Sequence, residues 1–494
     1  MIPRFRRRAV CGALVALIVS ALAFGAAVPA SAASYVAIAG SGSTWSQNAL
    51  DQWRRNVASN YGMTVNFSGT GSSAGRSDFI KGSVDFAVSE IPFQRTPEDG
   101  SAPEISERGY AYLPIVAGGT SLMYNLKIGG KKVDNLQMSG DVVAKIFAGQ
   151  IKKWNDPAIV ADNPGLALPD KDIMPVVRSD GSGSTAQFTK WMATQYPSIW
   201  TTPMTSQFPT SKLSAYKAQS GSLGVSGYVS QNYGEGSITY VEYSYAMKSG
   251  FPVVKVKNAA GSYVEPTAAN VEVALRAARI NEDTGSPDYL TQILDGVYNN
   301  PDPVAYPMSS YSYMIVPTQA TGIFNESKGY TLGEFVKYVV CQGQKQAGAL
   351  GYSPLPNNLV EAAFKQISKI PGSQVGAYDA NSCSNTGAAG SGDPTTGAAP
   401  AAAGAAGGGT AAAAGTDAAA AASGAAVGGD AVYDANGNLV SGSAAGGAAA
   451  VSAPFTLASD AGGVAQIGML AAALLLLAAV LVPPLLMRRR RATR

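Results

Sequence analysis

The chain has no histidine among its 494 residues. This absence excludes a histidine-activated serine nucleophile, imidazole acid–base catalysis and most zinc sites. No motif places another candidate base beside a serine, and no group of residues has the spacing of metal ligands. The sequence therefore predicts a protein that is not an enzyme and carries no metal or cofactor. A hydrolase built on serine nucleophiles is the disfavoured alternative.

Positive charge is scarce outside two short terminal segments. Nine of the 36 Lys and Arg residues are arginines within residues 4–8 and 488–494, where there are no acidic residues. The rest of the chain has 27 basic and 33 acidic residues, a net charge of −6. This mildly acidic body argues against nucleic acid as a partner, because that partner needs a basic face. A bound anion would have to be held by local hydrogen bonds rather than by a long-range field.

Residues 1–32 have the organisation of a secretory signal peptide. A basic start precedes an apolar stretch from 9 to 28, and Ala30-Ser31-Ala32 has the small-x-small pattern of a cleavage site. We therefore expect cleavage before Ala33 and export across the cytoplasmic membrane.

Residues 467–487 are apolar and long enough to cross a bilayer as one helix. Arginines follow directly, which predicts a basic cytoplasmic tail at 488–494. A cleaved wall-sorting signal is the alternative, but residues 457–461 match its pentapeptide poorly. We therefore expect a retained transmembrane helix that anchors an exported domain to the outer face of the membrane.

Cysteine is rare as well, with three residues in the chain. Cys11 lies within the expected signal peptide, so only Cys341 and Cys383 remain in the exported protein. Because the exported compartment is oxidising, we expect a disulfide between these two.

Large apolar residues are almost missing from 384–466, which is mostly Ala, Gly, Ser and Thr. This segment cannot bury a core, so we expect a disordered stalk. The block 33–377 is different, because it mixes strand patterns with amphipathic helices and indicates an α/β fold. Its length of some 340 residues favours two lobes. The clearest strand patterns lie at 64–67, 84–88, 173–177, 238–241 and 313–316.

Three loops rich in Gly, Ser and Thr each precede a helical pattern. They span residues 40–45, 69–75 and 178–185, and the third begins with Arg178 at the end of a β-branched strand. Backbone N–H groups at helix starts, hydroxyl donors and a guanidinium are the components of an oxyanion receptor. Three such junctions in one exported protein suggest helix N-termini that converge on one anion.

Each loop alone has a simpler explanation as a helix cap. Thr44 with Gln47, and Ser184 with Gln187, have the spacing of a capping box. The joint occurrence of three loops favours the anion site over capping.

These motifs resemble those of the phosphate-specific solute-binding proteins (PstS) of bacterial ABC importers. The resemblance rests on Gly-x-Gly-Ser-Thr-Trp at 40–45, Gly-Ser-Ser-Ala-Gly at 71–75, Val-Asp-Phe-Ala-Val-Ser-Glu at 84–90 and Arg-Ser-Asp-Gly-Ser-Gly-Ser at 178–184. Residues 146–156 and 236–243 add further matches. Order and spacing agree from about residue 35 to 369, which covers the folded block but neither stalk nor anchor.

The resemblance implies a two-lobed periplasmic-binding-protein fold of type II, with a hinge and with phosphate in the cleft. Lobe 1 would comprise about 35–116 and 309–377, and lobe 2 about 117–308. Arg178 would be the charged partner of phosphate, held in place by Asp180. The other expected ligands are the hydroxyl of Thr44, the backbone N–H of Trp45, the hydroxyl of Ser72, and the helix start at Ser182, Gly183 and Ser184.

Glu90 occupies the position at which this family usually has aspartate. A carboxylate there can accept a hydrogen bond from a protonated phosphate oxygen but repels fully ionised sulfate. We therefore expect Glu90 to set the choice of anion; the alternative is that it only ends a strand and points to solvent.

The resemblance thus predicts a monomeric receptor for inorganic phosphate that delivers its ligand to the permease subunits of an ABC importer by cleft closure. A surface-tethered anion sensor or adhesin that delivers no ligand is the alternative, because a stalk and an anchor suit that role equally well.

Overall fold

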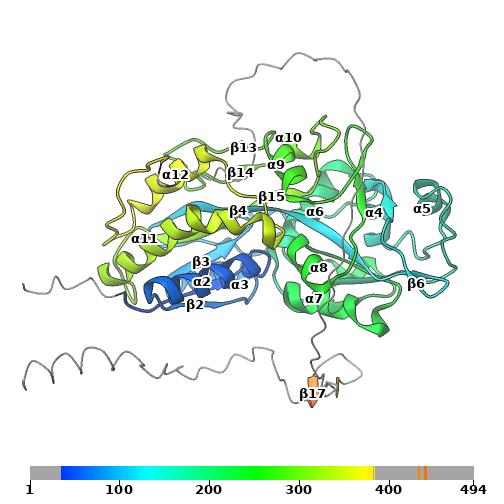
Figure 1. Cartoon of the computed structure of the whole chain (residues 1–494), viewed down its shortest axis with the longest axis horizontal. Coiled ribbons are helices and arrows are strands. Elements are labelled where there is room, and N and C mark those ends of the chain that lie inside the picture. Colours follow the sequence, from blue (N-terminus) through cyan, green and yellow to red (C-terminus); the bar gives the residue numbers. More distant parts are fainter. Residues whose placement is uncertain (1–34, 382, 384–431, 434–438, 442–494) are drawn as a thin grey trace, which may run out of the picture. The chain divides into compact units, whose positions relative to one another are not determined.

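The computed structural model describes residues 35–381, 383, 432–433 and 439–441 (Figure 1). The expected signal peptide, transmembrane segment and basic tail lie outside these residues. Residues 35–383 belong to one compact unit, and the segment around 432–441 belongs to a second. Across the part of the chain that is described, no helix has the length and apolar character needed to span a bilayer.

The second unit contains one short antiparallel pair, β16 (Val432–Tyr433) with β17 (Leu439–Ser441). This pair departs from the expectation that 384–466 has no secondary structure. Val432, Tyr433 and Val440 favour strands, and they stand out in a segment of Ala and Gly. The rest of the expected stalk lies outside the described residues.

The first unit is built on one eight-stranded sheet in the order β2-β1-β3-β15-β4-β10-β8-β9. Its strands are β1 (Ile38–Gly42), β2 (Val65–Ser68), β3 (Phe86–Ser89), β4 (Tyr110–Tyr124), β8 (Met174–Arg178), β9 (Lys217–Gln219), β10 (Ser237–Glu242) and β15 (Ser309–Pro317).

Two groups of parallel strands lie at opposite ends of this sheet. The first strand set is β1, β2 and β3, and the second strand set is β8, β9 and β10. Between them run β4 and β15, which are antiparallel to their neighbours. Parallel strands place their carboxyl ends at one edge, so each set presents one group of loops.

Strand β4 links the two sets. Up to Gly119 it pairs with β15, and from Thr120 to Tyr124 it pairs with β10. A Cβ at Gly118 would lie 2.7 Å from the ring of Trp45, so only glycine lets that side chain pack against the strand. The register of β4 and β15 shifts beside Ser312, which marks a β-bulge.

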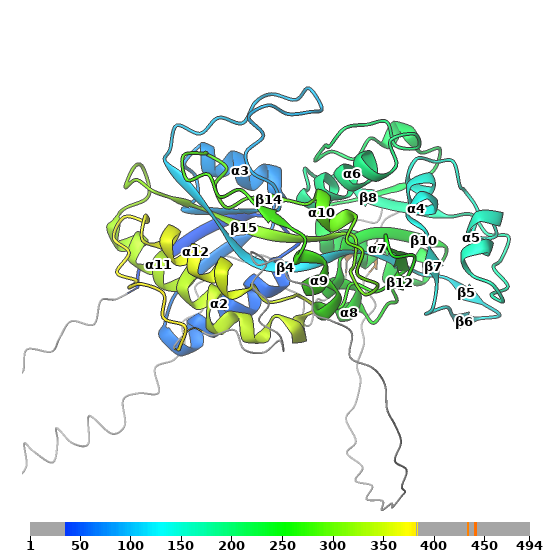
Figure 2. The ribbon, with the colours of Figure 1, turned by 90° about the horizontal axis from the view of Figure 1, so that it is seen from above.

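The helices pack around the two strand sets (Figures 1 and 2). Helices α2, α3, α11 and α12 lie with the first set and β4, and α6, α7 and α8 lie with the second. The α-helices are α2 (Gln47–Tyr61), α3 (Ser72–Ile80), α4 (Gly140–Phe147), α5 (Pro157–Asp162), α6 (Gly183–Gln195), α7 (Gly221–Ser230), α8 (Tyr243–Ser249), α9 (Ala268–Leu275), α10 (Asp295–Tyr298), α11 (Glu326–Val340) and α12 (Asn357–Ile367).

Short elements complete the unit. The 3-10 helices are η1 (Thr210–Lys212), η2 (Asn232–Gly234), η3 (Gln342–Gln346) and η4 (Gly348–Leu350). The minor strands are β5 (Lys127–Ile128), β6 (Lys131–Lys132), β7 (Gln137–Met138), β11 (Lys255–Lys257), β12 (Tyr263–Val264), β13 (Arg279–Ile280) and β14 (Gln292–Ile293).

All five strand patterns seen in the sequence form strands, with ends displaced by a few residues. Strands β1 and β4 were not anticipated as strands. β1 contains Gly40 and Gly42, and β4 contains Pro114 and a Gly-Gly pair, all of which normally interrupt strand patterns.

The hydrophobic core is continuous across the unit. One cluster of buried residues includes Trp53 on α2, Phe335 on α11, Phe188 on α6 and Tyr240 on β10. A smaller cluster packs α7 and α8 against the second strand set. The continuity follows from β4 and β15, whose residues are almost all buried along their whole length.

Cys341 and Cys383 are joined by a disulfide, with their Cα atoms 4.9 Å apart. Cys341 ends α11, so the bond fastens residue 383 to the helical layer beside the first strand set. The two residues are 42 positions apart in the chain.

We expect Cys383→Ser to lower the free energy of unfolding by about 4 kcal/mol, because a loop of this length loses that much chain entropy when closed in the unfolded state. Urea unfolding of the oxidised wild type and of the variant measures the difference. Equal stability would contradict the structural role of the bond.

Candidate functional site

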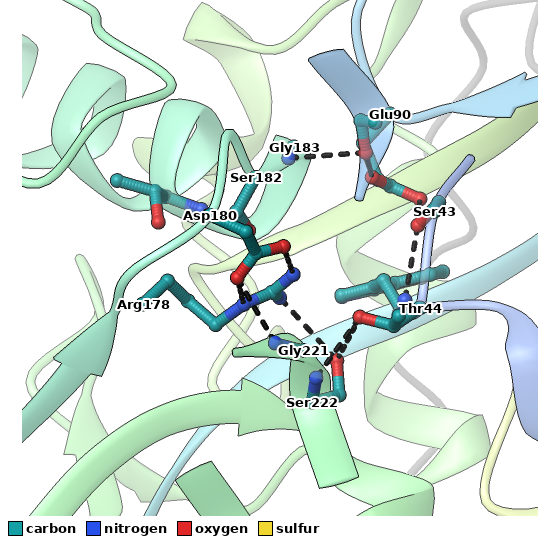
Figure 3. Close-up of polar contacts among 12 residues, drawn as sticks. Ser43, Thr44, Glu90, Arg178, Asp180, Ser182, Gly183, Gly221 and Ser222 are labelled. Atoms are coloured by element: carbon teal, nitrogen blue, oxygen red, sulfur yellow. Dashed lines mark hydrogen bonds and ion pairs between the residues drawn. The ribbon is translucent and has the colours of Figure 1, made fainter. Parts of the chain in front are cut away.

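The loops anticipated from the sequence lie at the carboxyl ends of the two strand sets. They follow β1, β2 and β8 and lead into α2, α3 and α6, and Glu90 follows β3 directly. Because β1, β2 and β3 are parallel, their loops share one edge of the sheet. Figure 3 shows the residues of the first set facing Arg178 and its loop from the second. The site therefore combines groups that are distant in the chain.

Direct hydrogen bonds join the second and third loops. The backbone N–H of Gly183 donates to the hydroxyl of Ser72 over 3.1 Å, and the backbone N–H of Ser73 donates to the carbonyl of Gly181 over 3.1 Å. Gly71 has φ +91°, and a Cβ there would lie 2.5 Å from Asp180 Oδ2. Glycine at this position is needed both for its backbone conformation and for the close approach of the two loops.

Arg178 is fixed by Asp180 in a two-pronged ion pair. Its Nε donates to Asp180 Oδ1 over 2.7 Å and its Nη2 donates to Oδ2. The Arg178 side chain is 2% exposed. Its Nη1 is 3.5 Å from the hydroxyl of Ser222, a residue that itself contacts Thr44 of the first loop. The orientation of the guanidinium is thus set before any ligand binds.

Asp180 is held in its charged form. Burial raises the pKa of its carboxyl, but hydrogen bonds from Arg178, the positive charge of that residue and the backbone N–H of Gly221 outweigh burial. The pKa of Asp180 therefore lies below its ordinary value of 3.8. A lowered folded-state pKa contributes stability above the unfolded-state pKa, and this contribution is lost as the pH falls through the folded-state pKa.

We expect Asp180→Asn to be about 2 kcal/mol less stable than the wild type at pH 7, because charged hydrogen bonds to Arg178 are lost. The difference should shrink as the pH falls below about 4. Unfolding temperatures at pH 7 and pH 3 measure it, with Asp170→Asn as a control on a mostly exposed ion pair. A difference independent of pH would contradict the assignment.

Glu90 is buried, so the alternative that it points to solvent is wrong. Its side chain is 1% exposed. Oε1 accepts hydrogen bonds from Ser43 at 2.5 Å and Ser312 at 3.0 Å, and Oε2 accepts one from Ser72 at 2.8 Å. Glu90 and Arg178 thus lie on opposite sides of the same group of loops (Figure 3).

Thr44 contacts a fourth loop that the sequence reasoning missed. Its Oγ1 is 2.9 Å from the hydroxyl of Ser222 and accepts the backbone N–H of Ser222 over 2.9 Å. The carbonyl of Thr44 also accepts the hydroxyl of Tyr245 over 2.5 Å. Ser222 lies at the start of α7, which follows β9 in the second strand set. The sequence Ser220-Gly221-Ser222 after a short strand is the same signal as in the other loops.

The remaining expected ligands have distinct positions. The backbone N–H of Trp45 donates to Ser43 Oγ over 2.9 Å, so it supports the serine that holds Glu90. Ser182 caps α6, with its hydroxyl accepting the backbone N–H of Thr185. The hydroxyl of Ser184 is buried and has no hydrogen-bond partner among the described residues.

The capping explanation holds for one hydroxyl and fails for the others. Helix α2 has Ser46 at its N-cap position with no side-chain cap, and Thr44 turns to Ser222 instead. Ser182, not Ser184, caps α6. The capping boxes that were the alternative at 44–47 and 184–187 are therefore absent, and the hydroxyls of Thr44, Ser72 and Ser184 do not cap the helices that follow.

Three further residues belong to the site but were not expected from the sequence. Ser43 and Ser222 lie in Gly/Ser loops and could have been found by extending the motif search. Ser312 lies in the middle of β15 and is buried, so no local pattern distinguishes it from a core serine.

The arrangement offers many donors and few acceptors. Hydroxyls, helix starts and the guanidinium of Arg178 converge, which suits an oxyanion with several acceptor oxygens. Glu90 is an acceptor within this group, which suits an anion that still carries a proton. Among the residues the structure describes, no three His, Cys, Asp or Glu side chains are grouped so as to hold a metal ion.

Comparison with known proteins identifies the family. Residues 27–342 match the model of the PBP superfamily domain. The phosphate-binding protein PstS of Xylella fastidiosa is 30% identical over 327 residues, which are 66% of this chain and 83% of that protein. This chain belongs to the PstS family. The PstS of Haemophilus influenzae is 29% identical over 329 residues, covering 67% of this chain and 92% of that protein.

The fold is that of the PstS family, a two-lobed α/β fold like that of periplasmic binding proteins. A crystal structure of a human phosphate-binding apolipoprotein aligns with a TM-score of 0.52 and 20% identity, covering 70% of this chain and 98% of that one.

Proposed function

We propose that this PstS family member binds inorganic phosphate between its two strand sets and delivers it to an ABC importer. The observation that carries the proposal is the orientation of Arg178, which Asp180 fixes on two nitrogens while the third lies 3.5 Å from Ser222, the residue that contacts Thr44. A guanidinium held in this way among helix starts is a receptor for a tetrahedral oxyanion. The curated relatives are phosphate-binding proteins by name, which favours this function over a sensor or adhesin.

The assigned ligands are those expected from the motifs, with changed roles for some. Arg178, Ser184, the backbone N–H of Gly183 and the hydroxyls of Thr44 and Ser72 would contact phosphate. Binding would exchange the present hydrogen bonds from Gly183 to Ser72 and from Ser72 to Glu90 for bonds to the anion. Asp180 orients Arg178, Ser182 caps α6 and Trp45 supports Ser43. Glu90 would accept the proton of a phosphate P–OH group and would repel sulfate, which has no proton at neutral pH.

Delivery would proceed by opening the cleft about β4 and β15, the strands that link the two sets. Lobe 1 would comprise about 35–116 and 309–377, and lobe 2 about 117–308. The contacts from Thr44 to Ser222 and from Ser72 to Gly183 cross between these lobes. Such a hinge motion would break these polar contacts, and a bound anion bridging the same loops would favour the closed state.

The setting of the receptor is part of the proposal. Export by residues 1–32, a stalk at 384–466 and a membrane helix at 467–487 would hold a monomeric receptor at the outer face of the membrane. The permease subunits of the importer would be its partner there. The disulfide between Cys341 and Cys383 suits an exported, oxidising location.

Thermal unfolding in the presence of different anions tests the binding function. Phosphate at a hundred times its Kd would stabilise the protein by about 2.7 kcal/mol, because it binds only the folded state. Sulfate and chloride at matched ionic strength should have little effect. Absence of a phosphate-specific rise in unfolding temperature would overturn the proposal.

A further inference from the structure

The two carboxylate oxygens of Glu90 have different surroundings. Oε1 is directed to the sheet, where it accepts hydrogen bonds from Ser43 at 2.5 Å and from Ser312 at 3.0 Å. Oε2 accepts a hydrogen bond from Ser72 at 2.8 Å and is directed to the opposing loop. A Cβ at Gly183 would lie 2.0 Å from Oε2, so this oxygen lies against the start of α6. Oε1 is therefore held by Ser43 and Ser312, while Oε2, which is bonded to the expected phosphate ligand Ser72, faces the anion site.

Ser312 has the geometry of a fixed donor to Oε1. It lies in β15 beside the bulge in the β4 pairing, and it is fully buried. Its hydroxyl is 2.9 Å from the hydroxyl of Ser46 and 3.0 Å from Oε1. A hydroxyl has one proton, so Ser312 donates either to the Oγ of Ser46 or to Oε1, and the carboxylate is the stronger of these two acceptors.

The main chain of Glu90 is held as well. Its carbonyl oxygen accepts from the side-chain amide of Gln187 at 2.9 Å and from that of Gln292 at 3.1 Å. Gln187 lies on α6 and Gln292 on β14, so the residue is fixed from two elements outside its own strand. With the main chain held in this way, the orientation of the carboxylate depends on the hydroxyls of Ser43 and Ser312 at Oε1 and on that of Ser72 at Oε2.

We propose that Ser312, together with Ser43, is a positioning residue that anchors Oε1 so that Oε2 alone faces the bound anion, and that this anchoring sets the discrimination between phosphate and sulfate. The inference rests on the proposed function. A carboxylate fixed by two hydroxyls cannot turn away when sulfate enters, so its lone pairs repel that anion. The same fixed oxygen accepts the proton of phosphate without reorganising.

The test compares Ser312→Ala with Ser310→Ala. Ser310 lies on the same strand, is equally buried, and its hydroxyl has no partner among the described residues, so it controls for loss of a buried hydroxyl. Competition titrations of the purified protein give the Kd for phosphate and for sulfate. We expect the ratio of sulfate Kd to phosphate Kd to fall about tenfold in Ser312→Ala, as one hydrogen bond to a charged group is lost, and to stay at the wild-type value in Ser310→Ala.

Other outcomes overturn the inference in recognisable ways. An unchanged ratio in Ser312→Ala, or an equal weakening of both anions, would show that Ser312 has only a structural role. Ser43→Ala removes the second anchor of Oε1 and should lower the ratio likewise, so it supplies the answer if Ser312→Ala does not fold. A wild-type protein that binds no phosphate would refute the proposed function itself. If the wild type prefers phosphate over sulfate and both Ser312→Ala and Ser43→Ala keep that preference, only the anchoring role is refuted.

Discussion

Replacing Arg178 by methionine is expected to weaken phosphate binding by roughly 100- to 1,000-fold, since it deletes a charged hydrogen-bond donor. The loss is larger than for a neutral donor because Asp180 remains. In the wild type the charge of Asp180 is compensated by two hydrogen bonds from Arg178. Without the guanidinium, the carboxylates of Asp180 and Glu90 both repel an incoming anion, and no positive charge at the site compensates for them.

Isothermal titration calorimetry with phosphate measures this effect. Arg54→Met is the matched control, because Arg54 is also paired with an aspartate, Asp51, but lies on α2 with about a quarter of its side chain exposed. The control should bind phosphate like the wild type. Retention of phosphate affinity within a few fold in Arg178→Met would mean that the anion site lies elsewhere.

Glu90→Gln should lower the preference for phosphate over sulfate by about 100-fold. The substitution keeps the shape of the side chain, and an amide can exchange hydrogen bonds with the surrounding hydroxyls of Ser43, Ser72 and Ser312. It removes the negative charge, which lifts the repulsion of sulfate, and it replaces a charged acceptor for the phosphate proton by a weaker, neutral one. Sulfate affinity should therefore rise while phosphate affinity falls.

The same competition titration with both anions measures the preference. Glu361→Gln on α12 serves as control, since Glu361 is half exposed in a surface ion pair with Lys365. A Glu90→Gln protein that still excludes sulfate as strongly as the wild type would show that the discrimination comes from another group.

The sequence allowed the main parts of the site to be predicted because they are local. The Gly/Ser loops sit directly after strands, and Arg178 and Asp180 are two residues apart, so their pairing needs only one turn of chain. Ala49, Leu50 and Trp53 likewise recur at helical spacing, a short-range pattern, and their side chains are buried on α2.

The contacts that complete the site join residues far apart in the chain. Thr44 and Ser222 are 178 positions apart, and Glu90 and Ser312 are 222 apart. No periodicity or motif encodes such pairings, which depend on the order of strands in the sheet and on the bulge beside Ser312. The roles of Ser182 and Ser184 cannot be separated from the sequence either. Serine is suited both to capping a helix, as Ser182 does, and to donating a hydrogen bond to a ligand, as proposed for Ser184.

The most direct test of the central claim is a calorimetric titration of the wild-type protein with phosphate in the presence of excess sulfate. A receptor built on Arg178 and Glu90 should bind one phosphate per chain, and the Kd should be nearly the same with and without sulfate. The claim would be contradicted if no phosphate bound, or if sulfate competed with phosphate at the same site with a Kd similar to that of phosphate.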